Sequence, residues 1–299
     1  MAVSGGHPAG ARVVFTRGSV RLDPPVAVPE GAVAAQVSVI SPGTELRHLA
    51  ATSTGPDHPA GYMTVSHTIP PGGERLLAPV PHGAPVARTD AQALRVPAGI
   101  AVELVAVARF QLMAGLGLAP VARMLDTAPS VCVVGAGPVA LGCVLELHRL
   151  GVTEVRVITR HPRPAVEQLP GVTIVPGTAR GAAGVVIDCT GQVDVALNAV
   201  ATGGLLGLLG TPREHTVLSA AQVHRRGLVV VGMHELASDD RPTRQAMFRA
   251  VLKSVEADLD RDLVRSWCRT DPGSRAPSVY AELAGPHRPL APVLLLEWT

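Results

Sequence analysis

The chain has 299 residues, of which 47% are hydrophobic and 17% charged, and it carries a formal net charge of +2. This composition is typical of a globular protein with room for two cores, and it excludes a disordered chain. The near-neutral charge and the aromatic content of 2% argue against a polyanionic partner and against base stacking, so we expect no nucleic acid to bind.

Residues 1–8 contain neither a basic region nor an apolar core, so the sequence predicts no signal peptide. The apolar stretches are interrupted by charged residues or glycine and are too short for a membrane span. The four cysteines, at positions 132, 143, 189 and 268, form neither a Cys-x-x-Cys pair nor a disulfide framework. We therefore expect a cytoplasmic protein without a membrane partner.

The first hundred residues predict a β-rich region. Short strands are expected at 12–16, 19–22, 32–40, 63–69 and 75–80. The stretch 51–90 is rich in Pro, Gly, His and Thr and predicts long loops. Residues 99–125 then show a helical pattern with apolar residues on most faces, which predicts a buried helix.

An apolar strand at 130–134 leads into a glycine turn, an apolar helix and a second strand. Gly135 lets the chain leave the strand in a conformation forbidden to side chains, and Gly137 leaves room for a pyrophosphate to touch the backbone. Pro138 and Val139 begin the helix, whose free N–H groups and positive dipole end would face the phosphates. This strand–turn–helix–strand unit predicts a dinucleotide-binding domain.

The second strand, at 154–159, ends without the Asp or Glu that hydrogen-bonds the ribose 2′-hydroxyl in NAD enzymes. It ends instead on Thr159 and Arg160, with Arg163 shortly after. A carboxylate would repel a 2′-phosphate, whereas a hydroxyl and two guanidinium groups would hold one by charge-assisted hydrogen bonds. The sequence therefore predicts NADP(H) as cofactor. For either arginine alone a solvated loop charge is the better explanation, but not for the whole cluster at residues 159–163.

The rest of the chain continues to alternate between predicted strands and predicted helices. Strands are expected at 172–175, 185–189, 205–210, 228–232 and 292–298, and helices at 193–201, 244–255 and 260–268. The stretch 176–184 is short for a parallel crossover, so either its helix is missing or the strand before it is misplaced. Thr190, Gly191 and Thr211 follow strands, and we expect them near the nicotinamide because ligands bind at the carboxyl ends of such strands.

A set of short motifs carries a family resemblance: Ile40-Ser41-Pro42-Gly43-Thr44-Glu45, Pro59-Ala60-Gly61-Tyr62, Gly73-Glu74-Arg75-Leu76, the turn at 135–142, Asp188-Cys189-Thr190-Gly191, and 203–212. In this order and spacing they resemble the medium-chain dehydrogenase/reductase superfamily over essentially the whole chain. The resemblance implies an α/β protein with a Rossmann doubly wound parallel sheet at 122–260. It also implies a β-rich GroES-like substrate domain at 1–121 and 261–299, and a homodimer.

Zinc-dependent members of the superfamily carry a Cys before a Gly-Thr-Asp motif and a Gly-His-Glu further on. Here Pro42 stands in place of the cysteine, and Tyr62 and Met63 stand in place of His-Glu. The third ligand position, near 107–108, offers no donor, and the four-cysteine lobe is absent. Because a tetrahedral zinc needs three or four such donors, we expect no metal site.

The resemblance implies that Thr44 is the hydroxyl that passes a proton between substrate and solvent. Tyr62 takes the place of a metal ligand, so its phenol could donate a proton to the substrate; packing in the cleft is the alternative. Glu45 could orient one of these groups or carry a proton, and a structural ion pair with an arginine is its alternative. His48 could extend a relay or lie on the surface, and His82 is expected to be structural.

Together these features predict a zinc-independent, NADPH-dependent oxidoreductase. It would transfer hydride to a C=O or a polarised C=C or C=N bond of a small molecule, in particular a specialised metabolite. The alternatives are a non-catalytic NADPH-binding sensor or structural subunit that retains the fold, and a subunit whose activity needs another chain.

Overall fold

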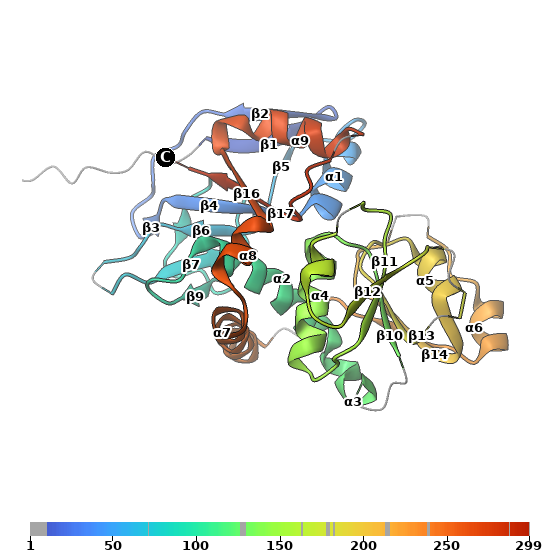
Figure 1. Ribbon diagram of the computed structural model, residues 1–299. Coiled ribbons are helices and arrows are strands. Elements are labelled where there is room, and N and C mark those ends of the chain that lie inside the picture. Colours follow the sequence, from blue (N-terminus) through green and yellow to red (C-terminus); the bar gives the residue numbers. More distant parts are fainter. Residues whose placement is uncertain are drawn as a thin grey trace, which may run out of the picture. The chain divides into compact units, whose positions relative to one another are not determined.

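The computed structural model describes residues 11–70, 72–125, 130–162, 164–177, 180–181, 183–212, 216–237, 240–286 and 288–298 (Figure 1). The chain divides into two compact units. Unit 1 comprises Met1–Ala106 and Asp260–Thr299, and unit 2 comprises Val107–Leu259. The first division lies inside a helix and earlier than the boundary expected at 121/122, whereas the second lies one residue from the boundary expected at 260/261.

Unit 1 is built on a six-stranded sheet in the order β16-β17-β4-β6-β7-β9. Its strands are β16 (Cys268–Pro272), β17 (Val293–Glu297), β4 (Ala35–Ile40), β6 (Thr64–Ser66), β7 (Arg75–Ala78) and β9 (Leu94–Val96). β17, from the end of the chain, pairs antiparallel with β4, Leu295 opposite Val39. The C-terminal return therefore completes a sheet that the N-terminal half begins.

The described residues of unit 1 also form two smaller sheets and three whole α-helices. β2 (Ser19–Asp23), β1 (Arg12–Thr16) and β5 (His58–Pro59) form one sheet, and β3 (Ala32–Val33) and β8 (Val86–Ala87) form the other. The helices are α1 (Pro42–Ala51), α8 (Arg261–Ser266) and α9 (Ala276–Ala284). A core cluster joins β1, β4, α9 and β17, and in it the Phe15 and Tyr280 rings meet edge to face at 5.1 Å.

The expected buried helix is present as α2 (Val102–Leu118), continued by a 3₁₀ turn and α3 (Ala122–Leu125). By length and composition, Val102–Leu125 could cross a membrane, but 72% of its most apolar window is buried inside the structure. This degree of burial is typical of the core helix of a globular protein.

Unit 2 contains a six-stranded parallel sheet in the order β12-β11-β10-β13-β14-β15 (Figure 1). The strands are β12 (Val172–Val175), β11 (Val155–Ile158), β10 (Val131–Val134), β13 (Ala183–Asp188), β14 (Val200–Leu208) and β15 (Val229–Gly232). Counted along the chain this order is 3-2-1-4-5-6, that of a doubly wound dinucleotide-binding sheet. The expected Rossmann architecture is confirmed.

The connections of unit 2 are uneven in length. After α2 and α3, the α-helices described in unit 2 are α4 (Pro138–Arg149), α5 (Val193–Ala199), α6 (Ala220–Arg226) and α7 (Arg241–Asp258). The expected third strand is correctly placed as β12, and the described part of the chain between β12 and β13 contains no helix. In the described residues between β11 and β12, the one helical element is the 3₁₀ turn η2 (Ala165–Gln168).

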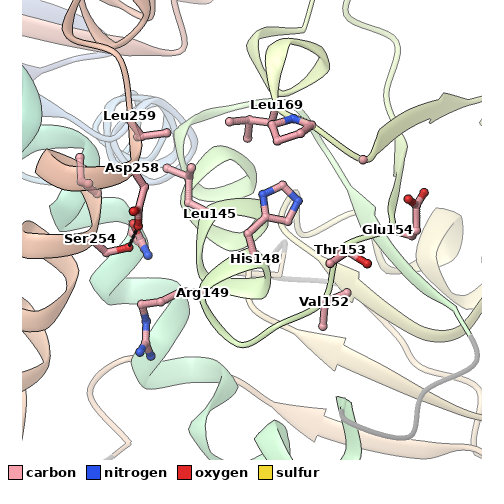
Figure 2. Close-up of a pocket in the computed structure, with 14 residues that line it drawn as sticks. Leu145, His148, Arg149, Val152, Thr153, Glu154, Leu169, Ser254, Asp258 and Leu259 are labelled. Carbon is pink, nitrogen blue, oxygen red and sulfur yellow. Dashed lines mark hydrogen bonds between the residues drawn. The ribbon is translucent and has the colours of Figure 1, made fainter.

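A cavity of about 720 Å³ lies beside this shortened connection (Figure 2). Leu145, His148 and Arg149 of α4 line one wall, and Leu169 follows η2 on another. Nε2 of His148 is buried without a hydrogen-bond partner among the described residues, and burial lowers the pKa of this histidine.

Candidate functional site

The glycine turn of unit 2 fits between two neighbouring strands. Gly135 has φ +120°, and its N–H donates to the Ile158 carbonyl at 2.8 Å. A Cβ on Gly135 would lie 2.8 Å from Cγ2 of Thr190. A side chain at this position is therefore excluded both by conformation and by the end of β13.

The N-terminus of α4 is open. Gly137 is the N-cap, in an extended conformation, and no side chain caps the helix. Gly137 is exposed, and a Cβ added to it would meet nothing within 4 Å. The first-turn N–H groups, including that of Val139 behind Pro138, have no intrahelical partner. This end of α4 is suited to the negative charge of a pyrophosphate.

The end of β11 carries the residues expected to select the cofactor. Thr159 Oγ1 accepts a hydrogen bond from the His161 N–H at 3.0 Å, which turns the chain directly after the strand. Arg160 is exposed in this turn. Arg163 lies outside the described residues. The structure places Thr159 and Arg160 at the same edge of the sheet as the glycine turn, because β10 and β11 are parallel neighbours.

The ends of β13 and β14 meet. Gly191 has φ +72°, and a Cβ on it would lie 2.2 Å from the Thr211 carbonyl oxygen. The Thr190 hydroxyl donates to Oδ1 of Asp188 at 2.7 Å and accepts from the Gln192 N–H at 3.0 Å. The Thr190 side chain therefore fixes the turn after β13, and the three residues expected near the nicotinamide lie at one edge of the sheet.

Asp188 is a buried acid that the sequence analysis did not single out. Its side chain is fully buried, and Oδ2 has no hydrogen-bond partner among the described residues. Burial raises its pKa, against the hydrogen bonds from Thr190, Gly191 and Gln192, which favour the charged form. An acid at the end of a strand in this motif was visible in the sequence, but its burial was not.

In unit 1, Thr44 and Glu45 lie in the first turns of α1, which begins at Pro42 after the N-cap Ser41. Pro at the first helical position removes an N–H that the helix could not satisfy. The Arg47 guanidinium donates to Oγ1 of Thr44 at 3.4 Å, one turn along the same helix. A cation therefore lies beside the hydroxyl expected to contact substrate.

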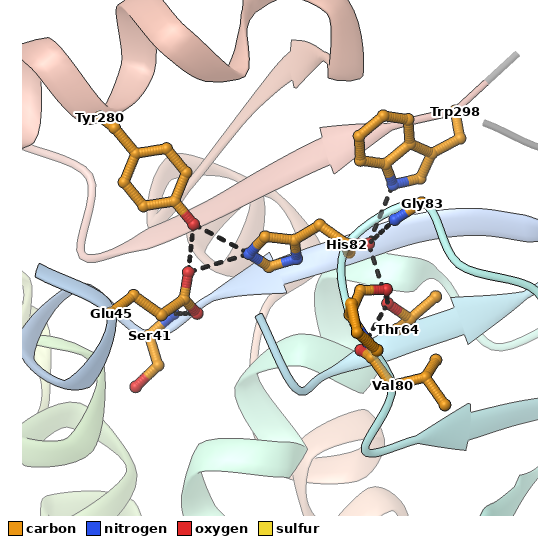
Figure 3. A network of polar contacts seen from close by, with 10 residues as sticks. Ser41, Glu45, Thr64, Val80, His82, Gly83, Tyr280 and Trp298 are labelled. Atoms are coloured by element: carbon orange, nitrogen blue, oxygen red, sulfur yellow. Dashed lines mark hydrogen bonds and ion pairs between the residues drawn. The ribbon is translucent and has the colours of Figure 1, made fainter. Parts of the chain in front are cut away.

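Glu45 is fully buried, and its partner is not an arginine (Figure 3). Its carboxylate lies 2.9 Å from Nε2 of His82 and accepts the Tyr280 hydroxyl and, at 2.7 Å, the Ser41 N–H. The alternative of an ion pair with an arginine is wrong. His82 is fully buried, as a structural histidine would be, but it belongs to a polar network.

Tyr62 and Met63 are the residues that the sequence analysis placed at the expected zinc-ligand positions. Met63 is fully buried, and Tyr62 is half-buried next to Gly61, which has φ +84°. Among the described residues, no group of three or more His, Cys, Asp or Glu side chains is placed to hold a metal ion. The donor set therefore does not fit a catalytic zinc, and the absence of zinc stays a prediction.

Tyr280 is the residue that sequence reasoning missed in this network. It lies on α9, 235 residues after Glu45 in the chain, and it is fully buried. It is one of only two tyrosines in the sequence, but the residues next to it in the chain do not indicate that its hydroxyl has a polar partner.

No protein-family model matches the sequence, and a comparison with curated proteins finds no match. Alcohol dehydrogenase TADH from Thermus sp. ATN1 has a similar structure, with a TM-score of 0.73 and 16% identity over 97% of this chain and 100% of that chain. The chain has a dehydrogenase/reductase fold.

Two further structures with this dehydrogenase/reductase fold are known in complex with a cofactor. Acetophenone reductase from Geotrichum candidum, in complex with NAD, gives a TM-score of 0.71 at 15% identity, over 98% of both chains. Quinone oxidoreductase from Thermus thermophilus, whose NADPH complex is known, gives 0.63 at 21% identity, over 96% of this chain and 99% of that one.

Proposed function

We propose that the protein is an NADPH-dependent oxidoreductase of the medium-chain dehydrogenase/reductase superfamily. It transfers hydride to a C=O or a polarised C=C or C=N bond of a small, specialised-metabolite substrate, without a catalytic zinc. The observation that carries the proposal is the open N-terminus of α4 at Gly137, in the first crossover of a 3-2-1-4-5-6 parallel sheet.

The cofactor edge of unit 2 supports dinucleotide binding residue by residue. Gly135 and Gly137 admit the pyrophosphate to the backbone, and Pro138 and Val139 present the first turn of α4 to it. Thr190, Gly191 and Thr211, at the adjacent strand ends, bind the nicotinamide half. The cofactors named for the similar structures, NAD and NADPH, agree with a nicotinamide cofactor.

The preference for NADP(H) follows from the end of β11. Residues 159–162 contain no acid, and the exposed Arg160 follows Thr159 directly. In the bound complex, the guanidinium of Arg160 would pair with the 2′-phosphate. Arg163, the second candidate donor, lies outside the described residues.

When bound, the cofactor supplies a hydride to the substrate. The other atom of the reduced bond, an oxygen, nitrogen or carbon, would then gain negative charge, which hydroxyl donors stabilise. Thr44 donates a hydrogen bond to this charge, and the Arg47 cation at 3.4 Å from its Oγ1 strengthens that donation. Tyr62 delivers the proton that completes the reduction. The partners are the small-molecule substrate and, as in the superfamily, a second copy of the chain; the expected location is the cytoplasm.

Calorimetric titration with NADPH and, separately, with NADH tests the proposal, followed by a turnover screen with ketones, enones and imines. We expect tight binding of NADPH, weaker binding of NADH, and NADPH oxidation with at least one substrate class. Binding of NADPH without turnover on any class would favour a sensor or structural subunit. Failure to bind either cofactor would overturn the proposal.

A further inference from the structure

We propose that Glu45, His82 and Tyr280 are positioning residues, which hold one buried negative charge and thereby fix the two segments that carry Thr44 and Tyr62. For its effect on turnover this inference rests on the proposed function. All three side chains are fully buried, and they come from α1, from the loop after β7 and from α9 (Figure 3).

The three polar groups meet in a triangle. Nε2 of His82 lies 2.9 Å from Oε2 of Glu45 and 2.9 Å from the hydroxyl of Tyr280. The Tyr280 hydroxyl donates to the same carboxylate oxygen. In the proposed state Glu45 is ionised and can only accept, so both neighbours donate to it. This arrangement requires a proton on Nε2 of His82.

The other ring nitrogen indicates the charge of His82. Nδ1 is buried and has no hydrogen-bond partner among the described residues. A second proton there would leave a buried N–H of a cation without an acceptor, which costs more than an unused lone pair. His82 is therefore neutral, in the Nε2–H form, and the network carries a single negative charge on Glu45.

On one side the network holds the start of α1. Oε1 of Glu45 accepts the N–H of Ser41, the N-cap of the helix, at 2.7 Å. The Ser41 side chain makes no capping hydrogen bond, so the Glu45 carboxylate satisfies this terminus instead. Thr44 lies inside the turn that this hydrogen bond closes, so its position depends on the orientation of Glu45.

On the other side the network holds the segment before Tyr62. The His82 ring lies against Gly61, where a Cβ would come within 2.4 Å of Cε1 and Nδ1. The backbone N–H of His82 donates to the Ala60 carbonyl at 2.8 Å. Tyr62 is the next residue after this contact. Burial first, then the charge of Glu45, and last Tyr62 raise the pKa of the Tyr280 phenol.

The charge state is tested by NMR of the protein with ¹⁵N-labelled histidine. The signals of His82 are assigned from their loss in the His82→Gln variant. We expect the neutral Nε2–H form at neutral pH. A doubly protonated ring, or a proton on Nδ1 alone, would overturn the assignment of the charge to Glu45. This readout needs no substrate, so it stands whether or not the protein proves to be a reductase.

The positioning role is tested with Glu45→Gln and Tyr280→Phe, which preserve shape but remove a charge and a hydroxyl. Ser66→Ala is the matched control: its buried hydroxyl accepts the Leu76 N–H at 3.0 Å and donates to the His67 carbonyl, away from the network. In both network variants we expect faster hydrogen–deuterium exchange in residues 41–49 and 60–63, which do not include the control position, than in the control. Exchange in these segments that matches the control would overturn the positioning role.

The second readout is the turnover rate. It is divided by the concentration of NADPH-binding sites, so that a smaller folded fraction does not lower the measured kcat. A shift of the hydroxyls by about 1 Å is expected to lower kcat by about 100-fold. The dissociation constant of NADPH should stay within about twofold, because its residues lie in unit 2. Faster exchange with unchanged kcat would show that the three residues only stabilise the fold, and would overturn their role in positioning the catalytic hydroxyls. Absence of turnover in the wild-type protein would refute only the proposed function.

Discussion

At the scale of single residues, cofactor choice depends on a few side chains at the end of β11. Arg160 is exposed there, directly after Thr159, whose hydroxyl turns the chain. For Arg160→Ala we expect NADPH binding to weaken by about 2 kcal/mol, roughly 30-fold, because a charge-assisted hydrogen bond is lost. NADH has no 2′-phosphate, so its affinity should hardly change, as calorimetry with both cofactors will show.

Arg156→Ala is the matched control, because Arg156 is an exposed arginine within β11 itself. It should leave both affinities unchanged. Equal losses for NADPH and NADH in Arg160→Ala would show that the arginine does not recognise the 2′-phosphate.

Residues of the glycine turn were predictable because their chemistry is local. Gly135, Gly137 and Pro138 are defined by spacing along a few residues, and the structure places them at the helix N-terminus that the motif predicts. Glu45 was singled out from the same kind of motif, but its partners were not. His82 and Tyr280 reach it from 37 and 235 residues away in the chain, and no local pattern reports such contacts.

At the scale of elements, α4 packs against α2 through a glycine. A Cβ on Gly142 would lie 2.4 Å from the backbone of Phe110. For Gly142→Ala we expect a loss of about 3 kcal/mol in the free energy of unfolding, since backbone atoms must move to admit the methyl group. Denaturant unfolding measures this loss.

Gly43→Ala serves as control, because Gly43 is also helical but has nothing within 4 Å of an added Cβ. Its change should stay within about 1 kcal/mol, the range of helix propensity. If Gly142→Ala changes the free energy of unfolding as little as Gly43→Ala does, α4 and α2 can move apart without cost, and their close approach does not contribute to stability.

Several elements differ from the sequence expectations for identifiable reasons. α1 was not expected, because Ser-Pro-Gly at its start is typical of a turn, yet Pro is favoured at the first helical position. The strand expected at 32–40 is divided into β3 and β4, which pair in different sheets. β16 was missed because its sequence, Cys-Arg-Thr-Asp-Pro, has no alternating apolar face.

At the scale of the whole molecule, one ion pair joins two residues of unit 2 that lie 126 positions apart in the chain. Both guanidinium nitrogens of Arg109 donate to Glu235, at 2.7 and 2.8 Å. Burial opposes the charge of Glu235, but Arg109 outweighs it and lowers the pKa below its usual 4.5. Above that value this pair stabilises the fold, and the contribution is lost as pH falls through the lowered pKa.

Glu235→Gln should therefore cost about 3 kcal/mol at neutral pH, because the nearly buried Arg109 loses the charge of Glu235. The difference from wild type should shrink as pH falls from 4.5 through the lowered pKa, at which Glu235 becomes neutral in the folded protein as well. Thermal unfolding as a function of pH measures both effects. Glu154→Gln, at an exposed acid, should show neither.

Metal content is a property of the whole molecule as well. With Pro42, Tyr62 and Met63 at the ligand positions, we expect less than one equivalent of tightly bound metal by elemental analysis of the purified protein. Stoichiometric zinc that survives dialysis against a chelator would contradict this expectation and would require ligands outside the motif.

The sequence by itself determined the Rossmann sheet, the glycine turn and the expected cofactor edge, because strand periodicity and glycine spacing act over a few residues. Only the tertiary structure decided which side chains meet Glu45, how closely α4 approaches α2, and that the last strand of the chain pairs with β4. These contacts join residues far apart in the chain, and they form because burying apolar surface brings distant segments together, after which each buried polar group must find a partner.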